Sequence, residues 1–317
     1  MTEPVLPAAR EGELARYAAR LEMHTFESLT LADEHFLLGQ ADLGRPVTLA
    51  GLLRLATAGT DRPPAVILVH GSGGLSPNVE FWQRELGALG VSTFTLDAFT
   101  GRGLTAVNTD QAALGRTNLI LDLYRALEVL ARHPRVDGSR VAVMGFSRGG
   151  QAALYASLTR FDTLWNRSGI RPVLYLPVYP DCSITFIGEL DVAERPIRVL
   201  HGAADDYNPL GPCAAYVERL RAAGRDAALT VFPDAHHVFD DPIGPEPPEP
   251  IAGAQSLRRC LIREEPAGRL VNARTGEPFT YADPCVERGP RAGADPAARS
   301  AALRVVARAL GEAFGPR

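Results

Sequence analysis

Apolar runs alternate with helical patterns through the middle of the chain. Residues 65–69 (Ala-Val-Ile-Leu-Val) are continuously apolar, as expected for a strand buried on both faces of a parallel sheet. Strands that alternate with helices build βαβ units, so we predict an α/β fold with a mostly parallel, doubly wound sheet flanked by helices. Further strands are predicted at 91–96, 140–145, 172–178, 197–201 and 227–232, and helices at 78–90, 110–132, 148–160 and 209–223.

The two ends of the chain follow other patterns. Apolar spacing over 11–24 predicts a short helix on the sheet edge, and 25–31 with 46–56 predict opening antiparallel strands. Five of the nine residues from Pro242 to Pro250 are proline, so a loop-rich excursion is expected at 241–295. An amphipathic helix over 296–313 closes the chain. Without an internal repeat, residues 1–317 are predicted to form a single domain whose core spans about 45–240.

Composition and charge narrow the function classes. The net charge is −4, from 33 basic and 37 acidic residues in mixed order, which leaves no basic stripe for nucleic acid and no polybasic membrane patch. Lysine is absent, which excludes Schiff-base chemistry on lysine. No run approaches the ~20 apolar residues of a membrane helix. The first residues lack the pattern of a signal peptide, so we expect a cytoplasmic protein, or a periplasmic or secreted one if a signal peptide once preceded this sequence.

The four cysteines form no CxxC pair, which argues against zinc and redox motifs. In a cytoplasmic protein we expect free, buried thiols. If the chain is oxidised, Cys182 should pair with Cys213 and Cys260 with Cys285.

The chemistry centres on Gly145-Phe-Ser147-Arg-Gly149, which stands between a predicted strand and a predicted helix. In this context a GxSxG sequence makes a tight, strained turn that raises the serine hydroxyl above the sheet. The flanking glycines are needed because side chains there would collide where strand and helix approach. We interpret Ser147 as a nucleophile; the alternative is a plain glycine turn between strand and helix.

A serine nucleophile needs a base, and the base needs an orienting acid. In doubly wound sheets these groups follow the carboxyl ends of strands, so His236 or His237 is predicted as the base. Asp205 or Asp206, after the strand at 197–201, is predicted as the acid. The alternatives are a surface histidine pair and a helix N-cap, and one aspartate could serve as acid while the other caps.

An oxyanion hole requires two backbone N–H groups aimed at the developing charge. One is predicted to be that of Arg148, directly after the nucleophile, and the other that of Ser72 in the glycine-rich loop after residues 65–69. That loop fails the GxGxxG pattern because Ser76 occupies the third glycine position. No metal or cofactor is implied.

With these residues in hand, the chain resembles the dienelactone hydrolase family of α/β-hydrolases, from about residue 45 to 240. The likeness lies in Gly-Phe-Ser147-Arg-Gly-Gly, in His-Gly-Ala-Ala-Asp205 followed by Pro209, and in Ala235-His-His237-Val-Phe239. The family pattern places the catalytic histidine on His237 and the acid on Asp205.

The resemblance has further implications. The loop Asp97-Ala-Phe-Thr-Gly-Arg102 looks like a family segment near the active site, so Arg102 could meet a substrate carboxylate; a structural role is the alternative. Dienelactone hydrolases proper use cysteine at the elbow, and Ser147 there favours a general serine esterase. The tail with Cys260 and Cys285 resembles an extension of some bacterial relatives, several of them exported, which counts against a cytoplasmic location.

We therefore expect a hydrolase that cleaves small carboxylic esters or lactones through an acyl-Ser147 intermediate. A peptidase or acyltransferase would use the same triad. A dehalogenase would need a carboxylate at position 147. A binding protein that kept the fold is the alternative from another class. Homodimerisation through an edge strand or the last helix is left open.

Overall fold

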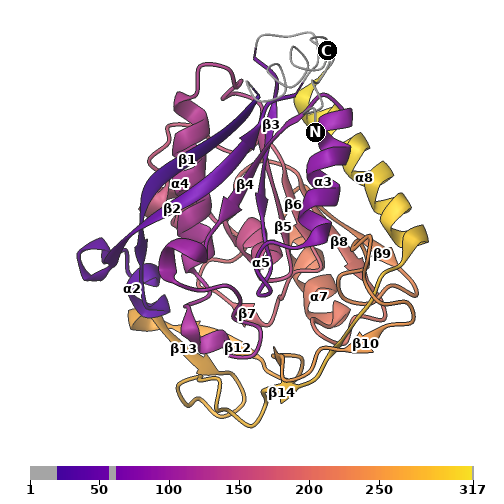
Figure 1. Cartoon of the computed structure of the whole chain (residues 1–317). Coiled ribbons are helices and arrows are strands. Elements are labelled where there is room, and N and C mark those ends of the chain that lie inside the picture. The colour runs from indigo at the N-terminus through magenta and orange to yellow at the C-terminus, as the bar shows by residue number, and fades with distance from the viewer. Residues whose placement is uncertain (1–19, 57–61, 316–317) are drawn as a thin grey trace, which may run out of the picture.

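A central eight-stranded sheet organises the computed structural model, which describes residues 20–56 and 62–315. Its strand order is β1-β2-β4-β3-β5-β6-β8-β9 (Figure 1). Neighbouring strands from β4 to β9 are parallel, whereas β2 runs antiparallel to both β1 and β4. The strands are β1 (Leu21–Thr30), β2 (Arg45–Arg54), β3 (Ala65–Val69), β4 (Ser92–Asp97), β5 (Val141–Phe146), β6 (Tyr175–Val178), β8 (Ile197–Gly202) and β9 (Ala227–Phe232). The predicted fold class is confirmed.

Helices cover both faces of the sheet because alternate residues of each buried strand point to opposite sides. In β3, Ile67 packs into one apolar core with α4, α5 and α7, while Leu68 packs into a second core with α3 and α8. Figure 1 shows α3 and α8 together on their face of the sheet. The helices are α2 (Asp33–Leu37), α3 (Pro77–Ala88), α4 (Asn118–Arg132), α5 (Arg148–Tyr155), α6 (Thr159–Trp165), α7 (Leu210–Ala222) and α8 (Pro296–Phe314).

The structure corrects three predicted helices. Of the helix at 11–24, residues 11–19 lie outside the described residues, and residues 21–24 instead begin β1, where every residue has a partner on β2. The helix at 110–132 starts only at Asn118, after the short 3-10 helix Gln111–Ala113. The helix at 148–160 ends at Tyr155, because Leu158 is extended and bridges to Val192 before α6 begins.

The excursion after β9 lies across the carboxyl ends of the parallel strands, at the lower edge of Figure 1. It touches the segment that follows β6, since β12 pairs with β7, and it also bridges to His237 after β9 through Ala292. The excursion is rich in loops, as predicted, and its strands are short. Its strands are β10 (Glu249–Pro250), β11 (Gln255–Ser256), β12 (Ile262–Glu265), β13 (Arg269–Asn272), β14 (Glu287–Arg288) and β15 (Arg291–Ala292), and the partner strand β7 (Ile184–Thr185) precedes them in the chain.

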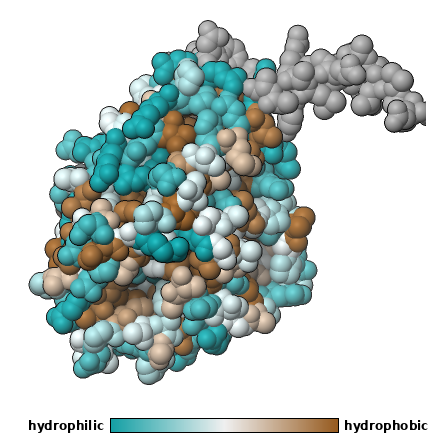
Figure 2. All heavy atoms as spheres, turned by 60° about the vertical axis from the view of Figure 1, so that its left-hand side comes forward, coloured by the Kyte–Doolittle hydropathy of each residue, from teal (hydrophilic) through white to brown (hydrophobic). Residues whose placement is uncertain are grey.

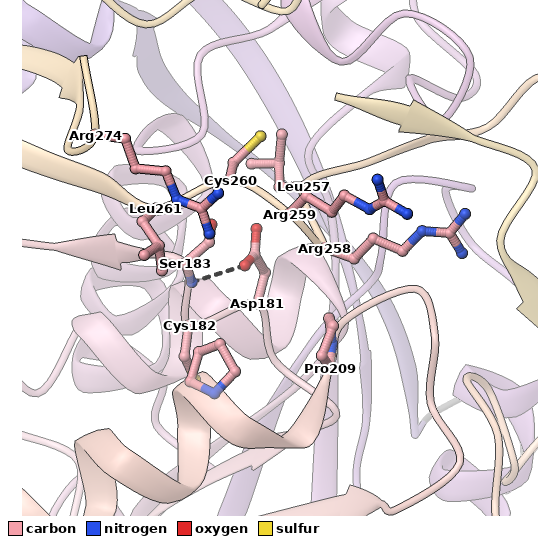
Figure 3. Close-up of a pocket in the computed structure, with 11 residues that line it drawn as sticks. Asp181, Cys182, Ser183, Pro209, Leu257, Arg258, Arg259, Cys260, Leu261 and Arg274 are labelled. Carbon is pink, nitrogen blue, oxygen red and sulfur yellow. Dashed lines mark hydrogen bonds between the residues drawn. The ribbon is translucent and has the colours of Figure 1, made fainter. Parts of the chain in front are cut away.

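All four cysteines are oxidised, so the expectation of free thiols was wrong. Cys182 is bonded to Cys213 and Cys260 to Cys285, the pairing expected for an oxidised chain. The first bond ties the segment after β6 to α7, and the second closes a loop within the excursion. Cys182 and Cys260 border one cavity, in which the Asp181 carboxylate accepts a hydrogen bond from the Ser183 N–H (Figure 3).

Removing the Cys260–Cys285 bond should destabilise the protein. The bond closes a sequence separation of 25 residues. Its loss as a C260S/C285S pair should lower the free energy of unfolding by about 3 kcal/mol, because the unfolded chain regains freedom. Urea denaturation followed by circular dichroism would measure this. An unchanged midpoint would show that the bond does not constrain the unfolded chain.

The face in Figure 2 mixes hydrophilic and hydrophobic side chains without one broad apolar area. In the part of the chain that the structure describes, no helix is long and apolar enough to cross a bilayer.

Candidate active site

The turn between β5 and α5 places Ser147 in a strained backbone conformation. Its φ of 54° and ψ of −115° are rare for a residue with a side chain, and such strain is characteristic of functional sites. Glycine is required on both sides. A Cβ at Gly145 would lie 1.9 Å from the Gly149 carbonyl oxygen, and one at Gly149 would lie 2.1 Å from the Val69 oxygen. The Gly-x-Ser-x-Gly spacing therefore lets strand, loop and helix meet beneath Ser147, which is half-buried.

His237 links Ser147 to Asp205. Its Nδ1 lies 2.7 Å from Asp205 Oδ2, and its Nε2 lies 2.9 Å from Ser147 Oγ. A carboxylate can only accept, so Nδ1 carries the proton and Nε2 of the neutral ring accepts from the serine hydroxyl. Of the two adjacent histidines, the structure brings His237 to the serine. Both His237 and Asp205 are buried, so water competes little for these bonds.

The acid is held by its own loop. Asp205 Oδ1 accepts from the N–H groups of Tyr207 (2.8 Å) and Asn208 (2.9 Å), which leaves Oδ2 for the histidine. Asp206 points elsewhere: it pairs with Arg258 and accepts from the Arg291 N–H. Neither aspartate caps α7, whose N-cap is a proline, so the capping interpretation was wrong.

Two tyrosines that the sequence analysis did not single out pack against the imidazole. The Tyr207 ring lies 4.6 Å from that of His237 at 31°, and the Tyr179 ring makes an edge contact at 4.8 Å. The Tyr179 hydroxyl donates to buried Asp240, which also accepts from the Trp82 indole. Burial raises the pKa of Asp240, although both hydrogen bonds favour its charged form. The sequence could have pointed to Tyr207, because this residue stands only two positions after the predicted acid, Asp205.

The loop after β3 comes up against the nucleophile. A Cβ at Gly71 would lie 3.3 Å from Ser147 Cβ, which is closer than ordinary van der Waals contact, so a glycine suits this approach. Next to it, buried His70 donates from Nδ1 to the Gly71 carbonyl and accepts at Nε2 from the Ala98 N–H. Burial lowers the pKa of His70, so the ring is neutral and this donor–acceptor pattern is fixed. Among the described residues, the backbone N–H groups of Ser72 and Arg148 have no acceptor, as an oxyanion hole requires.

Arg102 does not reach out to a substrate. Its side chain is 1% exposed, and all five N–H donors of its guanidinium are used. It holds Asp122 in a two-bond ion pair, at 2.7 and 3.0 Å. The remaining bonds go to Thr30 Oγ1 and to the carbonyls of Leu29 and Ala98. The structure thus contradicts the predicted substrate contact and supports the structural role.

One group in the described part of the chain has the residue types of a metal site: Glu22, His24 and His133. The Nε2 atoms of His24 and His133 both lie within hydrogen-bond distance of Glu22 Oε2, at 3.0 and 2.9 Å. His133 Nδ1 accepts from the Arg135 N–H, so its Nε2 carries a proton and donates to the glutamate. This arrangement is satisfied as a hydrogen-bonded network, and it contains none of the triad residues.

The chain is similar to known proteins in sequence and in fold. The model of the dienelactone hydrolase family matches residues 52–261. A protein of Yersinia pestis named "Putative carboxymethylenebutenolidase" is 30% identical over 128 residues, which is 38% of this chain and 45% of that protein. The chain thus matches less than half the length of this relative.

Solved structures share the fold. A dienelactone hydrolase-like promiscuous phosphotriesterase from metagenomic libraries has a TM-score of 0.57 at 17% identity, and a structure named m3DLH has 0.59 at 19%. Both similarities cover 92% of this chain and 99% of the other. The family match spans about two thirds of the chain and includes the elbow, the acid and the base, so this protein belongs to the dienelactone hydrolase family.

Proposed function

We propose that the protein is a serine hydrolase that cleaves carboxylic esters or lactones. The observation that carries the proposal is the unbroken chain of hydrogen bonds from Ser147 Oγ through His237 to Asp205, at 2.9 and 2.7 Å. A base within hydrogen-bond reach is what converts a weakly nucleophilic hydroxyl into an attacking group, and the third residue fixes the base in the right tautomer.

The proposed reaction begins when Ser147 Oγ attacks the acyl carbon as His237 Nε2 takes the hydroxyl proton. The carbonyl oxygen becomes an anion, which the N–H groups of Ser72 and Arg148 stabilise. The anion then collapses: the ester C–O bond breaks, the imidazolium gives its proton to the leaving alcohol, and the acyl group stays on Ser147 Oγ. Water, deprotonated by the same nitrogen, releases the acid and restores Ser147. Asp205 stays ionised and stabilises the imidazolium throughout.

The family match, the name of a relative and the serine at the elbow favour esters and lactones as the substrates. The family match includes the whole triad, and the relative in Yersinia pestis is named for a butenolide, which is a lactone. A serine in place of the family's cysteine forms an oxygen ester intermediate, which suits general ester hydrolysis.

Hydrolysis of p-nitrophenyl esters of increasing acyl length is the direct test. The wild-type protein should release p-nitrophenol from at least the short esters, and Ser147→Ala should not. A lactone such as dihydrocoumarin extends the series, with the opened acid followed by pH indicator. Equal, negligible rates for both proteins on all of these substrates, together with no labelling of Ser147 by a fluorophosphonate, would overturn the proposal.

A further inference from the structure

A buried glutamine joins the two residues that would supply the oxyanion hole. Gln111 is 1% exposed and precedes α4 in the 3-10 helix Gln111–Ala113. Its side-chain oxygen Oε1 accepts from Ser72 Oγ at 3.1 Å and from Arg148 Nη1 at 2.8 Å. Ser72 belongs to the loop after β3 and Arg148 to the start of α5, so one carboxamide connects two separate segments.

Arg148 depends on Gln111 for its placement. The side chain of Arg148 is buried and faces carbonyl oxygens: Gln111 Oε1, the Gln111 backbone oxygen and the Leu114 backbone oxygen. No carboxylate within the described ranges forms an ion pair with it, and its Nε has no acceptor. Burial lowers the pKa of Arg148 to about 10, which still leaves the guanidinium charged at neutral pH. Losing the Gln111 side-chain acceptor would therefore leave a buried cation with fewer of the neutral oxygens that solvate it.

Gln111 is itself fixed from two other sides. Its backbone N–H donates to Gln255 Oε1 at 2.7 Å, and Gln255 is part of the C-terminal excursion. Its side-chain Nε2 donates to the Tyr207 hydroxyl at 3.3 Å, and the Tyr207 ring packs on His237. The carboxamide thus has a defined orientation, with its oxygen toward Ser72 and Arg148. The excursion thereby contributes to the site although it supplies none of the triad.

We infer that Gln111 is a positioning residue for the oxyanion hole: it ties Ser72 to Arg148 so that their two backbone N–H groups stay aligned on the acyl oxygen. This inference rests on the proposed function. Donors that stabilise a transition state must keep their geometry to within about 0.5 Å, and two donors from different segments have no covalent means of doing so.

Gln111→Met tests the inference, since methionine keeps the length and loses every side-chain hydrogen bond. The matched control is Gln83→Met, which removes a buried glutamine that bonds to Thr95 on the other face of the sheet. Three quantities are measured for the wild type and both variants: kcat and KM for a short p-nitrophenyl ester, the rate constant for fluorophosphonate labelling of Ser147, and the Ki of an alkyl boronic acid. Thermal melting shows that each variant is folded at the assay temperature.

The inference predicts that Gln111→Met lowers kcat and the labelling rate constant by about 10- to 100-fold, while KM changes by less than about threefold. The boronic acid places a tetrahedral oxygen in the hole, so its Ki should rise in parallel with the fall in kcat/KM. The pH at which activity is half-maximal should not move, because the triad is untouched. Gln83→Met should match the wild type in all of these readouts.

Other outcomes overturn the inference. A folded Gln111→Met protein with wild-type kcat and labelling rate would mean that the two N–H groups are aligned without the glutamine. A shifted pH profile would place the effect on His237 through Tyr207 instead. Losses that Gln83→Met shares would make the role merely structural. The proposed function fails in a different way, through a wild-type protein that neither turns over an ester nor becomes labelled at Ser147.

Discussion

Alanine at Ser147, at His237 or at both positions should reduce kcat/KM for a short ester to the same floor, on the order of 10⁴-fold or more below wild type. The nucleophile and the base act as one unit, joined by the 2.9 Å contact between Ser147 Oγ and His237 Nε2. Once either is gone, the other has no partner in the attack. The residual rate should come from substrate binding and the oxyanion donors alone. Steady-state kinetics on the two single variants and the double variant would measure this non-additivity.

His236→Ala is the matched control. His236 is adjacent in the chain, but the structure brings only its neighbour to the serine, so this variant should keep kcat/KM within about threefold of wild type. A dead His236→Ala with an active His237→Ala would reverse the assignment of the base. Losses that multiply in the double variant would show that the two residues contribute separately, which a shared proton transfer does not allow.

The parts of the site that sequence predicted well are those that local backbone chemistry determines. Gly145 and Gly149 indicate the tight turn around Ser147, because a Cβ at either position would overlap backbone atoms of a neighbouring segment. The acid and the base follow β8 and β9, and the carboxyl ends of parallel strands meet at one edge. The alternation of apolar runs with helical patterns indicates βαβ units, which is why the fold class was predictable, whereas the strand order came only from the structure.

Tertiary contacts account for most of what sequence could not predict. Gln111 lies 39 residues from Ser72 and 37 from Arg148 along the chain, and the residues next to it in the sequence do not indicate that its side chain bonds to both. The excursion had no periodicity to place it across the strand ends. The thiols were expected to be free because a cytoplasmic protein was assumed, whereas the structure shows both pairs bonded, in the pairing expected for an oxidised chain.

Arg102 shows how a family resemblance can locate a residue and miss its role. The resemblance places it in a loop near the active site, but the direction of its side chain depends on an acceptor that comes from α4, Asp122. Sequence carries no sign of that pairing. The two roles make opposite predictions, because a buried ion pair affects stability whereas a substrate contact affects catalysis.

Arg102→Met should lower the free energy of unfolding at pH 8 by about 3–5 kcal/mol, because it leaves Asp122 as a buried charge without its counterion. Both side chains are at most 1% exposed, so water cannot replace the lost partner. Of the surviving contacts, the hydrogen bond from Ser28 Oγ to Asp122 (2.6 Å) is too little to compensate a full charge. Urea denaturation at fixed pH would measure the loss.

The dependence on pH identifies the buried carboxylate as the cause. Burial raises the pKa of Asp122 even while Arg102 opposes the shift, so removing Arg102 should raise it further. A carboxyl whose pKa is higher in the folded than in the unfolded state favours folding less as the pH rises above the unfolded value. The deficit of Arg102→Met should therefore shrink from pH 8 toward pH 5, as protonation relieves the stranded charge.

The double variant R102M/D122N provides the control, because it removes the stranded charge along with its partner. It should recover a large part of the stability at pH 8 and lose the pH dependence of the deficit. At temperatures where each variant is folded, kcat/KM should stay near wild type for neutral and for carboxylate-bearing esters alike. If Arg102→Met instead keeps its stability and loses activity only on carboxylate-bearing esters, the arginine contacts substrate after all, and the five hydrogen bonds that occupy it here must open when substrate binds.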